Sequence, residues 1–349
     1  MTGFRIGERP LGPEAPCFVI AEAGINHNGS PDLARQLVDL AHEAGADAVK
    51  FQTFQAERLV SPDAPKARYQ IANTNGAESQ LEMLKSCQLS YEDFTGLFDY
   101  CRHKGIVFLS TPFDAASLDF LVELGVPALK IGSGEVTNLP LLAQAARTGL
   151  PVILSTGMSN LAEVEAAVRT LRAGGCDRLA VLHCTSNYPA KPADANLRAM
   201  DTLAETFGVP VGYSDHTEGI AVSLASVALG AKVLEKHFTL DRSLPGPDHL
   251  ASVGPEELKA LVAGVRIVEQ SLGSGSKEPC KSEDNTREVA RRSLFTARDL
   301  AAGAVLRPED LIALRPGTGI PPTEMESVCG RQAVRDLAAG TMLQREHLS

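Results

Sequence analysis

The chain has 349 residues, of which 44% are hydrophobic and 22% are charged, and its formal net charge is −10. This composition is typical of a globular protein with enough apolar residues for a full core. The acidic balance disfavours a nucleic-acid-binding or anionic-membrane-binding surface, because both need clustered lysine and arginine, but a local basic pocket could still bind a small anionic substrate.

The seven cysteines are scattered, and no pair of them has CxxC spacing. A zinc knuckle or disulfide framework is therefore not expected, and a reduced, cytoplasmic protein fits best. No run of 18 apolar residues occurs, and the first residues contain no apolar segment. We therefore expect neither a membrane span nor a signal peptide.

Short β-branched runs alternate with helical patterns from about residue 17 to residue 272. The expected strands are at 18–23, 48–51, 107–110, 128–131, 152–155, 179–183, 211–214 and 233–237. The expected helices are at 31–44, 91–104, 115–124, 139–148, 161–173, 197–207, 220–229 and 255–272. Eight strand–helix units in about 255 residues predict an α/β protein with a closed (β/α)8 barrel. An open doubly wound sheet is the alternative, but its GxGxxG fingerprint does not follow the first strand.

The remainder of the chain has a different character. The polar segment 273–287 is expected to be a linker between a catalytic barrel at 1–272 and a small domain at 288–349. In the small domain, RDLAAGAVLRPEDL at 298–311 shares nine of fourteen positions with RDLAAGTMLQREHL at 335–348. Each copy should form a turn at glycine, a short strand and a helical turn. Two copies indicate a pseudo-twofold domain, because a solenoid needs three or more repeats.

Polar groups stand at the carboxyl end of nearly every expected strand. In chain order they are Glu22, Asn26, Lys50, Gln52, Ser110, Thr111, Lys130, Ser133, Ser155, Thr156, His183, Thr185, Ser186, Ser214, Asp215, His216, Glu235 and His237. One such residue would more often be a capping group. Eight strand ends meet at one mouth of a (β/α)8 barrel, however, and active sites of barrel enzymes lie there.

The residue types indicate the chemistry. Two lysines and three serines predict a pocket for a phosphate and a carboxylate together: Lys50, Lys130, Ser133, Ser155 and Ser214. His216 and His237 end adjacent strands, and neutral imidazoles there suit one divalent ion with open positions. Glu22 and Glu235 would then orient or deprotonate water, or hydrogen-bond a histidine. A nucleophile built from His183 and Cys184 is disfavoured, because neighbouring strand side chains point to opposite faces.

Ten stretches between residues 20 and 320 resemble the N-acylneuraminate (sialic acid) synthase family. They are IAEAGINHNG (20–29), VKFQTF (49–54), STPFD (110–114), KIGSGE (130–135), LSTGM (154–158), LHCTSNYP (182–189), GYSDHT (212–217), LEKHF (234–238), GPDH (246–249) and ALRPGTGI (313–320). The resemblance implies a (β/α)8 TIM barrel followed by a small C-terminal antifreeze-like (SAF) domain.

The resemblance also implies roles for particular residues. Phosphoenolpyruvate would be bound by Lys50, Thr111, Lys130, Ser133, Ser155, Ser186 and Ser214, although Ser186 stands where some members have asparagine. The amino sugar would contact Gln52, Asn75, Tyr188, Asp248 and, from the tail of a partner chain, Arg315. Glu22 and Glu235 would be catalytic. His216 and His237 would bind Mn²⁺, with Mg²⁺ or Co²⁺ as alternatives, and the protein would be a domain-swapped homodimer.

The implied reaction condenses phosphoenolpyruvate with N-acetylmannosamine or a related N-acyl amino sugar, with water, to a nine-carbon 2-keto-3-deoxy sugar acid and phosphate. The alternative is a legionaminic or pseudaminic acid synthase acting on a 2,4-diacetamido-trideoxyhexose. GPDHLAS at 246–252 is similar to the neuraminic and legionaminic branches. Two other classes remain: a Schiff-base aldolase using Lys130 or Lys236, and a carbohydrate or ice binder. The binder would not need the polar strand ends.

Overall fold

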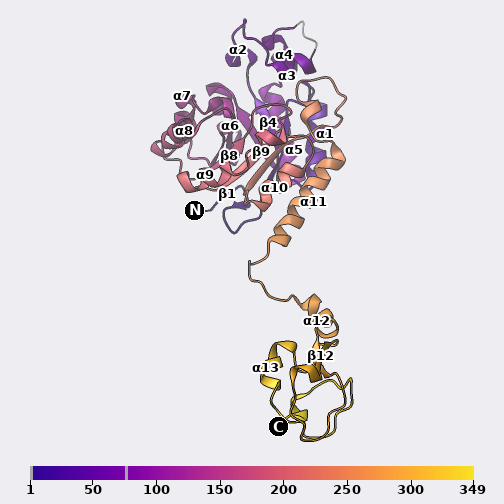
Figure 1. The fold of residues 1–349 in the computed structure, drawn as a ribbon. Helices are drawn as coiled ribbons and strands as arrows, with labels where there is room; N and C mark the ends of the chain where they lie inside the picture. Colours follow the sequence, from indigo (N-terminus) through magenta and orange to yellow (C-terminus); the bar gives the residue numbers. More distant parts are fainter. Residues whose placement is uncertain (1–2, 75–77) are drawn as a thin grey trace. The chain divides into compact units, whose positions relative to one another are not determined.

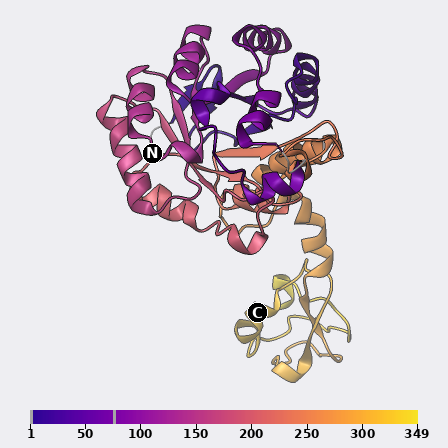
Figure 2. The same ribbon diagram turned by 90° about the horizontal axis from the view of Figure 1, so that it is seen from above.

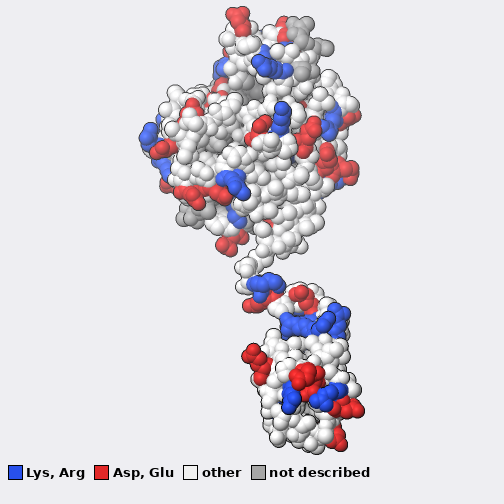
Figure 3. All heavy atoms as spheres, in the orientation of Figure 1, with Lys and Arg blue, Asp and Glu red and all other residues white. Residues whose placement is uncertain are grey.

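The structure is a computed structural model that describes residues 3–74 and 78–349. It consists of two compact units, one ending at Gly273 and the other beginning at Ser274 (Figure 1). None of the described helices combines the length and apolar character that a membrane crossing requires. On the face drawn in Figure 3, acidic and basic side chains are interspersed over both units.

Eight parallel strands form the sheet of the first unit, in the spatial order β5-β4-β3-β10-β9-β8-β7-β6. They are β3 (Phe18–Gly24), β4 (Ala48–Thr53), β5 (Val107–Pro112), β6 (Leu129–Ile131), β7 (Val152–Ser155), β8 (Leu179–Cys184), β9 (Val211–Asp215) and β10 (Val233–His237). The first and last strands of this order, β5 and β6, also contact each other. The sheet therefore curls into a nearly closed barrel with helices around it (Figure 2), and the expected (β/α)8 fold is confirmed.

Eight helices cover the barrel, each following one strand. They are α1 (Pro31–Glu43), α5 (Tyr91–Lys104), α6 (Ala115–Leu124), α7 (Leu139–Arg147), α8 (Leu161–Ala173), α9 (Ala199–Phe207), α10 (Ala221–Ala228) and α11 (Pro255–Leu272). The local sequence explains where several of these helices begin or end. The side chains of Ser30 and Ser90 cap α1 and α5, and α5 stops at Gly105 in the left-handed region. Apolar helix faces and outward strand residues share one large core.

Two parts of the first unit were not expected from the sequence. A hairpin of β1 (Phe4–Ile6) and β2 (Arg9–Leu11) packs Ile6 and Leu11 against the residues that fill the barrel interior. Three short helices, α2 (Ala56–Leu59), α3 (Arg68–Asn73) and α4 (Gln80–Cys87), lie between β4 and α5 at one end of the barrel (Figure 1). They have a small hydrophobic cluster of their own, which includes Met83 and Leu84.

The segment expected to be a linker, 273–287, is only partly without regular structure. A 3-10 turn, η4 (Lys281–Glu283), and helix α12 (Asp284–Ala290) occupy its second half. The reason is local, because the Glu283 carboxylate accepts a hydrogen bond of 2.9 Å from the backbone N–H of Cys280 and so starts the turn. The irregular stretch therefore ends at Cys280.

The two repeats of the second unit pair with each other. Leu300 and Leu337 exchange two backbone hydrogen bonds of 2.8 Å. The Asp336 carboxylate accepts from the N–H of Ala302 and the Asp299 carboxylate from that of Ala339, both at 2.7 Å. This reciprocity is pseudo-twofold. The expected helical turns are present as η5 (Pro308–Asp310) and η7 (Arg345–His347), whereas the expected strands after the glycines are only isolated bridges.

The regular elements that complete the structure are short. The second unit contains β11 (Ser293–Thr296), which pairs antiparallel with β12 (Leu311–Leu314), as well as η6 (Pro322–Glu324) and α13 (Met325–Val328). In the barrel, three 3-10 turns follow strands β6, β8 and β10: η1 (Ser133–Glu135), η2 (Pro192–Asp194) and η3 (His249–Ala251).

Candidate active site

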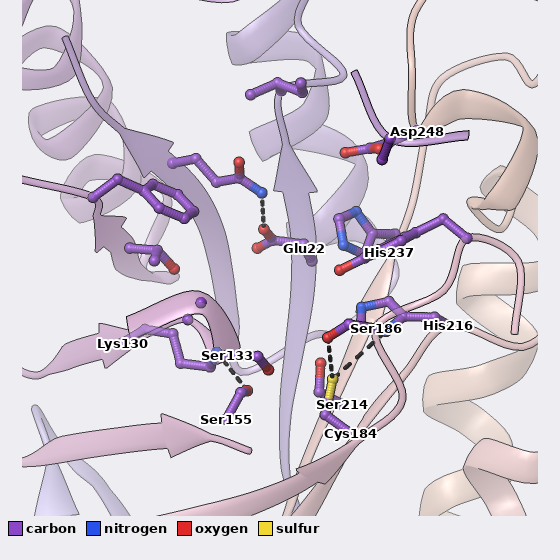
Figure 4. A pocket seen from close by; sticks show the side chains of 18 of the residues that line it. Glu22, Lys130, Ser133, Ser155, Cys184, Ser186, Ser214, His216, His237 and Asp248 are labelled. Atoms are coloured by element: carbon purple, nitrogen blue, oxygen red, sulfur yellow. Dashed lines mark hydrogen bonds between the residues drawn. The ribbon is translucent and has the colours of Figure 1, made fainter. Parts of the chain in front are cut away.

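A cavity of about 450 Å³ lies at the carboxyl ends of the barrel strands. Its lining contains the expected site residues Glu22, Lys50, Gln52, Thr111, Lys130, Ser133, Ser155, Ser186, Tyr188, Ser214, His216, Glu235, His237 and Asp248. Figure 4 shows side chains from several strands pointing into this space. Two expected sugar contacts remain. Asn75 lies outside the described residues, and Arg315 is an exposed residue of the second unit.

Two lysines and two glutamates form a buried charged group at the base of the cavity, and none of the four side chains is more than 5% exposed. Lys50 Nζ lies 2.8 Å from Glu22 Oε2 and 3.7 Å from Glu235 Oε2. Lys130 Nζ lies 3.5 Å from Glu235 Oε1. The parallel register of β4, β3 and β10 brings Lys50, Glu22 and Glu235 together, and Lys130 reaches Glu235 from β6. Such buried charges persist because they are paired.

Hydroxyl groups surround the two lysines. Lys50 donates to Thr111 Oγ1 at 2.9 Å, and Lys130 donates to Ser155 Oγ at 2.7 Å. Gly157 follows β7, and a Cβ atom at this position would lie 2.2 Å from Ser186 Oγ and 3.0 Å from Ser133 Oγ. Only glycine allows so close an approach. The lysines and hydroxyl groups together are donors of the kind that a phosphate or a carboxylate needs.

The surroundings of Glu22 and Glu235 shift the pKa values of the two carboxyl groups in opposite directions. Burial raises the pKa of Glu22 to about 7, against the opposing positive charge of Lys50. Burial acts in the same direction on Glu235, but Lys130 and Lys50 outweigh it and hold the pKa of that carboxyl well below its usual range. Two carboxyl groups with pKa values pushed apart are a common arrangement for acid–base chemistry. Glu22 is therefore the group able to exchange a proton near neutral pH.

The two histidines lie beside this charged group, with ring centroids 5.4 Å apart. His216 Nδ1 is 2.9 Å from the carbonyl oxygen of Thr185, so a proton on Nδ1 would leave Nε2 free to bind a ligand. His237 Nδ1 is buried without a hydrogen-bond partner among the described residues. Burial holds the pKa of His237 well below its usual value, which keeps the ring neutral. An orphaned nitrogen and a neutral ring fit a divalent metal ion.

A buried ion pair lies directly before both histidines in the chain. Lys236 Nζ is 2.9 Å from Asp215 Oδ2, and the two side chains are 1% and 0% exposed. Asp215 Oδ1 also accepts from the backbone N–H and the hydroxyl of Thr217, each at 2.8 Å. The pair links the ends of β9 and β10. Lys236 is not among the described residues that line the cavity, so it does not suit the Schiff-base alternative.

Several strand-end residues named in the sequence lie elsewhere. Asn26 donates to Ser252 and to the Phe238 carbonyl, and Thr156 donates to the Leu182 carbonyl. On β8, Cys184 lines the cavity, whereas the Nε2 atom of His183 lies 2.7 Å from the Ala195 carbonyl oxygen. The two neighbours therefore point to opposite faces, as alternation predicts.

Sequence reasoning missed an apolar part of the cavity wall. It is formed by Ile25, Leu59, Val60, Leu84 and Phe113, of which three come from α2–α4 and the turn that follows α2. A signal for this segment exists in the sequence, because Ser79 and Glu82 form a capping box that starts α4.

The fold and the cavity together define a (β/α)8 barrel whose mouth holds two buried lysines and several hydroxyl groups beside a histidine pair suited to a metal. The family model described as NeuB matches residues 37–277, and that of the SAF domain matches residues 291–349. The chain belongs to the NeuB family, and its second unit contains the expected antifreeze-like (SAF) domain. The expected relationship to the sialic acid synthases is confirmed, and with it the expectation that the chain is an enzyme of this kind.

Relatives cover nearly the whole chain. The N,N'-diacetyllegionaminic acid synthase of Legionella pneumophila is 52% identical over 98% of this chain and 97% of its own length. The N-acetylneuraminate-9-phosphate synthase of Mus musculus is 37% identical over 93% of this chain and 91% of its own length. A crystal structure of the N-acetylneuraminic acid (sialic acid) synthetase from Leptospira borgpetersenii, in complex with citrate, superposes with a TM-score of 0.74. It is 38% identical and covers 82% of this chain and 95% of that one.

Proposed function

We propose that this enzyme condenses phosphoenolpyruvate with a 2,4-diacetamido-trideoxyhexose and water, giving a nine-carbon sugar acid of the legionaminic type and phosphate. The observation that carries the reaction class is the buried anion pocket around Lys50 and Lys130 beside Glu22 and the histidine pair. The choice of sugar rests on the relatives, since 52% identity to a diacetyllegionaminic acid synthase exceeds 37% to an N-acetylneuraminate-9-phosphate synthase. This difference in sequence identity favours the 2,4-diacetamido-trideoxyhexose of the legionaminic alternative over N-acetylmannosamine as the substrate.

Phosphoenolpyruvate carries a phosphate and a carboxylate, and the base of the cavity offers two cations and several hydroxyl donors. Lys50 and Lys130 would bind these anionic groups, assisted by Thr111, Ser133, Ser155, Ser186 and Ser214. In the structure both lysines are paired with glutamates. Binding of the substrate would therefore replace carboxylate contacts with phosphate contacts, and it would favour a protonated Glu22 in the complex.

The open-chain sugar presents an aldehyde to the enol carbon of phosphoenolpyruvate. His216 and His237 would hold a divalent ion, with Mn²⁺ the first choice and Mg²⁺ or Co²⁺ as alternatives, and such an ion supplies Lewis-acid polarisation of the aldehyde oxygen. The enol electron pair forms the new C–C bond, and the aldehyde oxygen takes up a proton, which the protonated Glu22 would supply, leaving Glu22 as a carboxylate. Positive charge is left on the carbon that bears the phosphate.

Water then adds to that carbon. Glu22 or Glu235 would remove a proton from the water, and Glu22 has the pKa closer to neutral. The resulting tetrahedral carbon carries hydroxyl, carboxylate and phosphate groups. Its C–O bond to phosphate breaks, the hydroxyl becomes the 2-keto group and its proton leaves to the surroundings. Lys50, Lys130 and the neighbouring hydroxyl groups stabilise the charge on the departing phosphate.

The sugar would lie against the residues farther from the lysines. The Tyr188 ring packs against the rings of Tyr69 and His216, which are tilted to it by 33° and 45°, with ring centroids 4.9 and 4.1 Å away. Asp248 and Gln52 also line the cavity, and Asn75 remains a predicted sugar contact. We further propose a domain-swapped homodimer in which the exposed Arg315 of one chain reaches the sugar's N-acyl group in the other, because a guanidinium offers a fixed set of donors.

The test is release of inorganic phosphate from phosphoenolpyruvate in the presence of Mn²⁺ and one sugar at a time. The panel contains the 2,4-diacetamido-trideoxyhexose and N-acetylmannosamine, and Lys130→Ala serves as the inactive control. Phosphate release that depends on an N-acyl amino sugar supports the proposal. Condensation that uses pyruvate instead, with an adduct trapped by borohydride, would favour the aldolase.

A further inference from the structure

The cavity has two chemically different sides. The base is charged, whereas the wall from α2–α4 and the loop after β3 is apolar. Ile25 and Leu84 are 5% and 8% exposed, and Leu59 and Val60 are half-buried. All four belong to or pack against the small hydrophobic cluster of this segment. We call these four residues the apolar wall.

No positive charge accompanies the apolar wall among the described lining residues. Lys50 and Lys130 are the cations of that lining, and both are paired with glutamates at the base. The polar side chains that α3 and α4 add to the lining include the neutral amides of Gln70 and Gln80. This side of the cavity therefore offers apolar surface and amide groups, and no cation for a phosphate.

The reaction determines which end of the sugar meets this wall. Phosphoenolpyruvate contributes three of the nine product carbons, so C1 of the sugar must reach the base of the cavity and C6 becomes C9. The far end of the sugar, from C4 to C6, then points away from the lysines. The apolar wall is the part of the lining that differs in character from the charged base.

We propose that the apolar wall is the subsite for C4 to C6 of the sugar and selects a 6-deoxy, 4-N-acyl end without charge. This inference rests on the proposed synthase function. A C6 methyl group would be buried against Leu59, Val60 and Leu84, and the amide of a 4-N-acyl group would find partners in Gln70 and Gln80. A 6-hydroxyl buried in place of the methyl group would lose its water with no hydrogen-bond partner among Leu59, Val60 and Leu84, and a 6-phosphate would lack a cation.

The size of the expected selection follows from the chemistry. Apolar pockets discriminate against one extra hydroxyl by about 10- to 100-fold in kcat/KM. N-acetylmannosamine carries the 6-hydroxyl and also lacks the 4-N-acyl group, so we expect the 2,4-diacetamido-trideoxyhexose to exceed it by at least that factor. N-acetylmannosamine 6-phosphate should be the poorest of the three, because a dianion requires a paired charge on burial.

The test compares kcat/KM for these three sugars in the wild type and in two wall variants, Leu84→Gln and Leu59→Gln. Leu59 is only half-buried, so its variant should fold even if the Leu84 variant does not. Each variant should lower kcat/KM for the deoxy sugar about tenfold and leave N-acetylmannosamine within about threefold of wild type. The matched control is Leu81→Gln, on the same helix but not among the residues that line the cavity, which should preserve the wild-type preference.

The possible outcomes distinguish a failure of the proposed subsite from a failure of the proposed synthase function. Phosphate release with a preference for N-acetylmannosamine or its 6-phosphate would overturn the subsite and leave the synthase function standing. Equal losses for all sugars in a folded Leu59→Gln protein would also overturn it. If no sugar in the panel supports phosphate release, the proposed function fails and this inference fails with it.

Discussion

Replacement of Lys236 with methionine should reveal how strongly the buried ion pair supports the barrel mouth. The variant leaves the Asp215 carboxylate, which is 0% exposed, without its cation. Loss of one partner of a buried pair typically costs about 3–5 kcal/mol. Asp215 keeps hydrogen bonds from the Thr217 N–H, the Thr217 hydroxyl and the Ser223 hydroxyl. We therefore expect the free energy of unfolding to fall by about 3 kcal/mol, the lower end of this range.

The double variant Asp215→Asn/Lys236→Met separates the lost pair from the stranded charge. An asparagine side chain can still accept from Thr217 and carries no charge, so the double variant should recover at least about 1 kcal/mol relative to Lys236→Met. The free energies of unfolding are measured by urea unfolding followed by circular dichroism, since the chain has no tryptophan whose fluorescence could be used. The transitions of the two units must be fitted separately. A double variant as unstable as the sum of the single variants would refute the coupling.

The ion pair of Asp215 and Lys236 should also affect how tightly the two histidines bind a metal ion. Asp215 and Lys236 directly precede His216 and His237, so a shift of either strand end moves a proposed metal ligand. Partners that orient ligands typically change metal affinity by about 10- to 100-fold. We expect Mn²⁺ affinity, measured by calorimetry at a temperature where the variant is folded, to fall by about tenfold. Unchanged affinity in a destabilised variant would show that the pair is only structural.

Three further predictions concern the site. Chelation should abolish phosphate release and Mn²⁺ should restore it, because His216 and His237 are the proposed ligands of a divalent ion; full activity of a demonstrably metal-free sample would contradict this. Burial raises the pKa of Asp248 to about 6, so the folded state binds this proton more tightly than the unfolded chain. Relative to Asp248→Asn, the wild type should lose about 2 kcal/mol of unfolding free energy as the pH rises from 4 to 6, and parallel pH–stability curves of the two proteins would refute the pKa shift. A mixture of Lys130→Ala and Arg315→Ala proteins should regain activity on subunit exchange, up to about a quarter of wild type for random pairing, if Arg315 serves the partner's site. Confirmed exchange without recovery would place Arg315 in its own chain's site or outside it.

The order of elements and most of the cavity could be read from the sequence. Alternating strand and helix patterns are local, and eight of them in a row leave a (β/α)8 barrel as the natural way to bury both faces of the sheet. Once the barrel is assumed, its geometry brings all strand ends to one mouth. This is why Lys50, Lys130, His216 and His237, though far apart in the chain, could be assigned to one site in advance.

Other features were decided only by the tertiary structure. The sequence did not indicate that Lys50 would pair with Glu22, or that burial and the two lysines would separate the pKa values of the two glutamates, because both effects depend on register between strands and on exclusion of water. The segment containing α2, α3 and α4 was missed for a related reason. Its helices are too short to show a periodic pattern, and they are stabilised by packing on the barrel mouth, where Ile25 and Leu84 form a wall that no local pattern predicts.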